Sequence, residues 1–148
     1  MIYKIKGEVS TKRDNFVVVD CSGVGYKIFT AARNISKLTI GGEATFFCSF
    51  SLKQDGRAEL YGFLSERELE FFDLLNTVSG IGPKSAMGVL GGGGMDEIAA
   101  AINEGNPGLL MKTSGVGKKT AERVVLELKG KVAISDDMSR GIINRMEH

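Results

Sequence analysis

The chain of 148 residues is poor in the residue types from which catalytic and metal sites are commonly built, with one histidine, two cysteines and no tryptophan. Cys21 and Cys48 each lie in an apolar run, which favours small core residues over a disulfide or a metal pair. No apolar run approaches the roughly 20 residues that cross a bilayer, and the alternating start is not a secretory signal. These absences predict a cytoplasmic protein without cofactor or metal.

Against this background, one motif occurs twice. Ser79–Ala86 reads Ser-Gly-Ile-Gly-Pro-Lys-Ser-Ala, and Ser114–Ala121, 35 residues later, reads Ser-Gly-Val-Gly-Lys-Lys-Thr-Ala. Each copy follows a leucine pair and precedes an apolar run, as in two helices joined by a Gly-hydrophobic-Gly hairpin. Two ordinary glycine turns are the alternative. Matched Ser, Lys and Ala positions in both copies favour hairpins that bind the DNA backbone.

The chemistry of the motif explains its residues. Glycine adopts positive φ without steric cost and lets a ligand approach the main chain, while Ile81 or Val116 can plug the hairpin into its own core. The second helix begins with free N–H groups and a positive dipole end, a site for a phosphate oxygen. Lys84, Lys118 and Lys119 lie in those first turns. Lysines there oppose the dipole, which makes sense if an anion binds.

The overall charge does not carry this prediction, because 19 basic and 18 acidic side chains give a net charge of only +1. The distribution matters more. Lys112, Lys118, Lys119 and Arg123 gather around the second motif against Glu122. A local basic face is one interpretation, and a solvated mixed surface is the other.

The hydrophobic pattern predicts an α+β protein in three parts. Residues 1–64 are predicted to form a five-stranded barrel of the oligonucleotide-binding (OB) type, with a short helix over 31–38 after the third strand. Residues 65–130 are predicted to form an all-α domain with two helix-hairpin-helix motifs, and residues 131–148 a flexible tail or truncated linker. The predicted strands cover 2–9, 16–21, 25–29, 44–50 and 59–63, and the predicted later helices cover 83–90, 96–104, 107–112 and 118–129.

Several short sequence features add detail to these predicted domains. Gly7 is predicted to mark a bend or bulge in the first strand. Ser65 and Glu68 have the spacing of a capping box at the start of the helical part. The glycines of 91–94 favour a connection between the hairpins. Residues 117–120 have the wrong spacing for a phosphate-binding P-loop, so no nucleotide-hydrolysing site is predicted.

Several segments together resemble the RuvA family, the bacterial subunits that bind four-way Holliday junctions and guide branch migration. They are residues 1–7, 23–26 and 60–63 and the two hairpin motifs. The resemblance implies a homotetramer, with an octamer left open, whose partners are the RuvB ATPase and the RuvC resolvase. The implied DNA-binding residues are Gly80, Gly82, Lys84, Gly115, Gly117, Lys118, Lys119 and Arg123.

Two features depart from the family pattern. The family carries a loop with two adjacent acids, the acidic pin, whereas here Asp55 is followed by Gly56, a pair that also suits an ordinary hairpin turn. With one acid per subunit in place of two, a tetramer would repel phosphates less strongly, but its four acids would still repel them. The family also ends in a small RuvB-binding domain, for which residues 131–148 are too few, so the sequence gives no basis for RuvB contact by this chain.

Parts of the sequence are compatible with two other functions. DNA glycosylases place a catalytic aspartate about twenty residues after such a hairpin, and Asp136 or Asp137 lies near that distance, but little chain remains to build a base pocket. A single-strand binder would stack bases on exposed aromatic side chains. Phe46, Phe47, Phe50 and Phe63 lie in apolar runs and are predicted to be core residues. The sequence therefore favours a non-catalytic DNA-binding scaffold.

Overall fold

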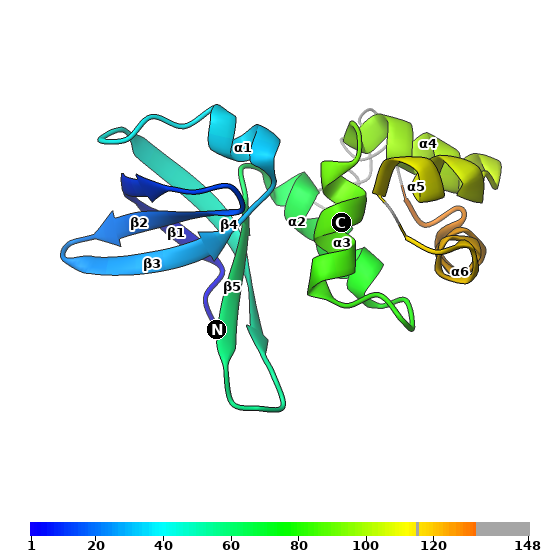
Figure 1. Ribbon diagram of the computed structural model, residues 1–148, viewed down its shortest axis with the longest axis horizontal. Helices are drawn as coiled ribbons and strands as arrows, with labels where there is room; N and C mark the ends of the chain where they lie inside the picture. Colours follow the sequence, from blue (N-terminus) through cyan, green and yellow to red (C-terminus); the bar gives the residue numbers. More distant parts are fainter. Residues whose placement is uncertain (115, 133–148) are drawn as a thin grey trace, which may run out of the picture. The chain divides into compact units, whose positions relative to one another are not determined.

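The computed structural model describes residues 1–114 and 116–132 (Figure 1). The chain divides into two compact units, Met1–Asp73 and a second that begins at Leu74. The predicted division into 1–64, 65–130 and 131–148 remains a prediction, and residues 133–148 lie outside the described part of the chain.

The first unit contains a closed five-stranded barrel. Its strands are β1 (Lys4–Lys12), β2 (Phe16–Cys21), β3 (Val24–Phe29), β4 (Glu43–Leu52) and β5 (Ala58–Phe63), with α1 (Ala32–Ser36) after the third strand. They close in the order β1-β2-β3-β5-β4, where β3 and β5 are parallel and the other pairs antiparallel. The barrel and the short helix confirm the predicted fold class.

Alternating residues of the strands fill the barrel. Val17, Val19, Ile28 and Phe46 are completely buried, because successive side chains of a strand point to opposite faces. Cys48 joins this core as a free thiol, and burial raises its pKa to about 11. The expectation of core cysteines is therefore confirmed for Cys48, whereas Cys21 is only half-buried and packs against this core.

Gly7 does not mark the bulge that the sequence predicts. The register between β1 and β2 shifts between Val9 and Thr11, three positions further on. Gly7 instead lies where a Cβ atom would collide with the main-chain carbonyl of Asp20, and its missing side chain allows β2 to approach. A glycine within a strand is consistent with both roles, so the sequence alone did not separate them.

Strands β4 and β5 extend beyond the barrel as a two-stranded ribbon (Figure 1). The pairs from Ser51↔Glu59 to Leu52↔Ala58 are made by these two strands, whereas β1 pairs with β4 only from Glu43 to Phe47. Phe50 lies just before this ribbon and beyond the part of β4 that pairs with β1. It is 41% exposed, so the prediction that it is a core residue is wrong.

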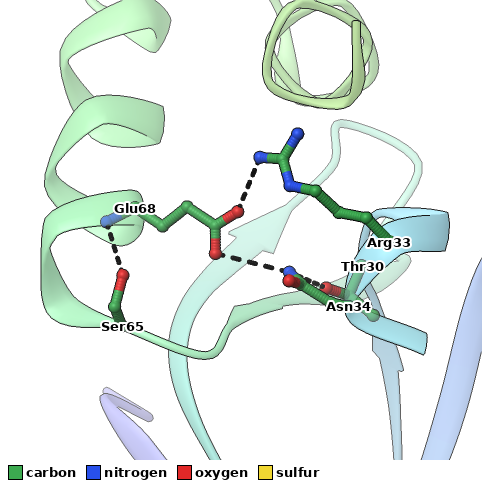
Figure 2. Close-up of polar contacts among 5 residues, drawn as sticks. All are labelled: Thr30, Arg33, Asn34, Ser65 and Glu68. Atoms are coloured by element: carbon green, nitrogen blue, oxygen red, sulfur yellow. Dashed lines mark hydrogen bonds and ion pairs between the residues drawn. The ribbon is translucent and has the colours of Figure 1, made fainter. Parts of the chain in front are cut away.

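Helix α2 (Glu66–Asn76) begins with half of the predicted capping box. The Glu68 amide donates to the Ser65 hydroxyl at 3.2 Å, as expected, but the Glu68 carboxylate turns to α1 (Figure 2). There it accepts hydrogen bonds from Arg33 at 2.9 Å and from Asn34 at 3.3 Å. Asn34 also donates to Thr30 at 3.0 Å. One buried carboxylate thus ties α2 to α1.

Replacing Glu68 with alanine is expected to lower the free energy of unfolding by about 2–3 kcal/mol, because Arg33 and Asn34 lose a buried charged partner. Urea unfolding followed by circular dichroism measures the change. Glu70→Ala, an exposed position on the same helix, is the control and should stay within about 0.5 kcal/mol of wild type. Equal losses in both variants would contradict this role of Glu68.

The second unit is helical. After the end of α2 come α3 (Pro83–Gly91), α4 (Met95–Glu104), α5 (Pro107–Ser114) and α6 (Lys118–Leu128), close to the predicted ranges. Gly92–Gly94 connect α3 to α4, as predicted for this glycine run. The apolar faces of these helices meet in a core made of Val89, Leu90, Ile98, Ile102, Leu110, Val124 and Leu128. Within the described residues, no helix has the length and apolar character to cross a membrane.

Candidate nucleic-acid interface

The first hairpin joins the end of α2 to α3. Gly80 has φ +90°, the left-handed conformation that glycine adopts without strain. Ile81 is 4% exposed, and its amide donates to the carbonyl of Val78 at 3.0 Å. The predicted apolar plug and positive-φ turn are therefore present. Gly82 then takes an extended conformation and serves as the N-cap of α3.

The second hairpin repeats this geometry at the start of its helix, although Val116 is only half-buried where Ile81 is buried, and Gly115 lies outside the described residues. Gly117 is extended and is the N-cap of α6, as Gly82 is for α3. The Ala121 amide donates to the Gly117 carbonyl at 2.9 Å, and the Ala86 amide donates to the Gly82 carbonyl at 3.0 Å. The sequence repeat is thus a structural repeat at the starts of α3 and α6.

Helices α3 and α6 both lack the side chains that usually neutralise the positive end of a helix dipole. Neither N-cap makes a side-chain hydrogen bond, and neither first turn contains an acidic residue. By contrast, α4 has Asp96 and Glu97 in its first turn. The starts of α3 and α6 carry exposed lysines instead, namely Lys84, Lys118 and Lys119. Because these cations oppose the helix dipole, the two N-termini have an unbalanced positive potential that suits an anion.

The two hairpins line one hollow of about 390 Å³. Its lining residues come from both copies of the motif: Gly80, Lys84, Ser85, Gly88, Val116, Gly117 and Thr120. Ser85 and Thr120 occupy the same position in the two copies, so each copy contributes one hydroxyl to this composite pocket. Both were absent from the predicted site, although a hydroxyl residue at matched positions of the repeat was a usable signal.

Arg123 lies one turn along α6 and reaches back to the first hairpin. Its Nη1 donates to the carbonyl of Ser79 at 3.2 Å. Arg123 is exposed, as are the three lysines, so the predicted cations of both copies face solvent. Of the described predicted residues, Gly80, Lys84 and Gly117 line the pocket and Arg123 contacts the first hairpin, whereas Gly82, Lys118 and Lys119 are not among the lining residues.

Asp55 lies apart in the sequence, at the turn between β4 and β5. Gly56 has φ +85°, as a tight hairpin turn requires. The Asp55 carboxylate accepts hydrogen bonds from the amide and from Nε of Arg57, both at 2.9 Å. These bonds hold the pKa of Asp55 below its usual range. Lys53 and Glu59 form a second ion pair at 3.1 Å, so the tip carries balanced charge.

Three residues considered for an enzymatic site, namely Asp136, Asp137 and His148, lie outside the described residues. Among residues 1–114 and 116–132, no group of three or more histidine, cysteine or acidic side chains is placed to hold a metal ion.

Comparison with known proteins matches both halves of this architecture. Residues 1–62 match the family described as RuvA N terminal domain, and residues 72–131 match the SAM-like Helix-hairpin-helix tandem. The chain is 41% identical over 142 residues to the Holliday junction branch migration complex subunit RuvA of Rickettsia bellii (strain OSU 85-389), covering 96% of this chain and 70% of that relative. The chain belongs to the RuvA family.

Other RuvA proteins match over similar lengths. The RuvA of Polaromonas sp. (strain JS666 / ATCC BAA-500) is 36% identical over 155 residues, covering 99% of this chain and 81% of the relative. The RuvA of Rickettsia felis (strain ATCC VR-1525 / URRWXCal2) is 38% identical over 133 residues, covering 90% of this chain and 65% of the relative. The family resemblance seen in the sequence is confirmed, and the chain spans about two thirds of the length of several RuvA relatives.

Proposed function

We propose that this protein binds four-way DNA junctions as a non-catalytic scaffold for branch migration in recombination and repair. The observation that carries the proposal is the composite pocket, in which two uncapped helix N-termini and the Lys84 side chain meet. Membership of the RuvA family supports the junction as the ligand, since its relatives are named as subunits of the Holliday junction branch migration complex.

The proposed contact is to the sugar–phosphate backbone and not to the bases. Main-chain amides at the starts of α3 and α6 would donate to phosphate oxygens, and the exposed lysines would supply charge. Such contacts give affinity without reading the sequence. Gly80, Gly82, Lys84, Gly115, Gly117, Lys118, Lys119 and Arg123 are the residues proposed to form this interface.

Selectivity for a junction would come from assembly. One chain supplies two hairpins, so a homotetramer supplies eight, or two for each of four arms. We propose the tetramer for this reason, in the cytoplasm, with RuvB as the ATPase motor and RuvC as the resolvase of the complete complex. We assign the two hairpins of this chain to DNA, and we assign none of its described residues to RuvB.

A competition experiment tests this function. The purified chain is titrated against a labelled synthetic four-way junction, with unlabelled junction, linear duplex or single strand of matched sequence as competitor. We expect the junction to compete at least about tenfold better than duplex, with complexes of tetramer size. Equal competition by all three DNAs would contradict the junction-binding function.

The approach of DNA to the hairpin main chain is tested by Gly82→Ala and Gly117→Ala. Both glycines are extended with open space around the position of a Cβ atom, so the free energy of unfolding should stay within about 0.5 kcal/mol of wild type. The added methyl group would meet an approaching phosphate, so affinity for duplex should fall about tenfold, as measured by fluorescence anisotropy. Gly91→Ala, also in open space, is the control. Unchanged binding by both hairpin variants would exclude close main-chain contact.

The balance of charges at the turn between β4 and β5 leads to another prediction. Arg57→Ala removes the cation that pairs with Asp55, so a tetramer would present four uncompensated acids around the centre of a junction. Junction affinity should fall roughly threefold or more at low salt and recover as salt screens the charges. Affinity for linear duplex, which does not need that centre, should change less than twofold. Equal changes for both DNAs in filter-binding assays would contradict the pin assignment.

A further inference from the structure

The side chain of Arg123 links the two hairpins. Arg123 belongs to α6, the helix that follows the second hairpin, yet its Nη1 donates to the carbonyl of Ser79 in the first hairpin at 3.2 Å. The same Nη1 is the nearest atom to where a Cβ of Gly80 would stand, at 3.9 Å. Arg123 therefore contacts the turn that has the positive-φ glycine, immediately before α3.

The repeat is asymmetric at this position. The residue of the first copy that corresponds to Arg123, 35 positions earlier, is Gly88. Gly88 lines the hollow between the hairpins and has no side chain with which to reach the second turn. The arginine link therefore runs from the second copy to the first, while the missing side chain at Gly88 leaves the shared hollow open.

We propose that Arg123 is a positioning residue that holds the first hairpin in the conformation in which Lys84 and the start of α3 meet phosphate. This inference rests on the proposed DNA-binding function and deepens it. A guanidinium has five N–H donors, and the bond to Ser79 uses one of them. The remaining donors can face a phosphate while the link is kept, so bracing and DNA contact do not compete.

A positioning role for Arg123 and independent phosphate contacts by Arg123 and Lys84 lead to different DNA affinities of the double variant. If Arg123 and Lys84 were separate cations, the losses of affinity from removing each would multiply. If Arg123 holds the turn before α3, its removal also weakens the contribution of Lys84. Replacing Lys84 should then cost less in a chain that already lacks Arg123.

A double-mutant cycle tests this claim. Affinity for a linear duplex and its dependence on salt are measured for Arg123→Ala, Lys84→Ala and the double variant. Lys118 is the matched control, because it begins the second hairpin's helix and lies five positions from Arg123, outside the i+3 and i+4 spacing at which helix side chains interact. We expect the cost of Lys84→Ala to shrink at least about threefold when Arg123 is absent. The cost of Lys118→Ala should stay within about twofold.

An experiment without DNA separates this inference from the proposed function. Amide hydrogen exchange of Ile81, which donates to Val78, is measured in wild type and in Arg123→Ala. Exchange should become several-fold faster at Ile81, with exchange in β2 unchanged. Unchanged exchange at Ile81 would overturn the positioning role. It would also be overturned if Lys84→Ala and Lys118→Ala each reduced affinity by the same factor with and without Arg123. A protein that bound no DNA would refute the proposed function, while the exchange result would still decide whether Arg123 braces the first turn.

Discussion

Replacing Lys84, Lys118 and Lys119 together with glutamine is expected to remove most DNA binding without destabilising the fold. All three side chains are exposed, and no acid in either first turn neutralises them. In the free protein they oppose the helix dipoles, so their removal should leave the free energy of unfolding unchanged or raise it by about 0.3–1 kcal/mol each. A gain in stability together with a loss of binding is the signature of cations kept for a ligand.

The salt dependence gives the size of the expected loss. Each phosphate contact contributes about 0.9 to the slope of log K against log salt for duplex DNA, so three lost contacts lower the slope by about 2.7. Over a fourfold range of salt, wild-type affinity should therefore fall about 40-fold more than that of the triple variant. Isothermal titration with a short duplex at several salt concentrations measures both slopes.

A control with the same change of charge distinguishes specific contacts from general attraction. Lys4, Lys37 and Lys131 are also exposed and lie outside the hairpins. Replacing these three with glutamine removes an equal charge but should leave the salt slope within about one of wild type. If the two triple variants lost the same slope, the phosphate contacts would not be concentrated at the hairpins.

The second large effect is expected in the barrel, where Gly62→Ala should lower the free energy of unfolding by about 3 kcal/mol or more. Gly62 pairs with Cys48 in the ladder between β4 and β5. A Cβ atom there would overlap Ile28 and Phe46, both completely buried. Because a close-packed interior has no free volume for an extra methyl group, the strands must move apart.

Gly25→Ala is the matched control for this barrel prediction. Gly25 lies in β3 and is exposed, and its added Cβ would meet one methyl group of Val18 at 3.1 Å. The cost there should be below about 1 kcal/mol, because the added group meets only one half-buried side chain, which needs to shift by a few tenths of an ångström. Denaturant unfolding followed by circular dichroism compares the two variants. Equal stability of both would show that the barrel interior tolerates a side chain at Gly62.

The sequence predicted most of the fold because its periodicities were strong and its turn residues distinctive. Alternation, apolar β-branched runs and turn residues identified the five strands, and Pro107 and the hairpin glycines placed the starts of α3, α5 and α6 close to their observed positions. The sequence did not reveal which strand residues leave the barrel. Phe50 lies in an apolar run, but β1 pairs with β4 only as far as Phe47, and local sequence pattern does not encode such long-range pairing.

The candidate site was predicted less completely. Lys84, Lys118 and Lys119 followed from their places in the motif, because the charge opposes a helix dipole. The hydroxyls of Ser85 and Thr120 were missed, since only the fold shows that the two copies share one hollow. The bond from Arg123 to Ser79 joins residues that are 44 positions apart, so the sequence alone did not predict it.

The measurement that tests the central claim most directly is amide hydrogen exchange of the protein with and without a four-way junction. If the paired hairpins bind the DNA backbone, exchange should slow in residues 79–86 and 116–122, the turns and first turns of α3 and α6. The same protection, to a smaller extent, is expected with linear duplex. Protection confined to the barrel strands, with both hairpins unchanged on saturation with junction, would contradict the account.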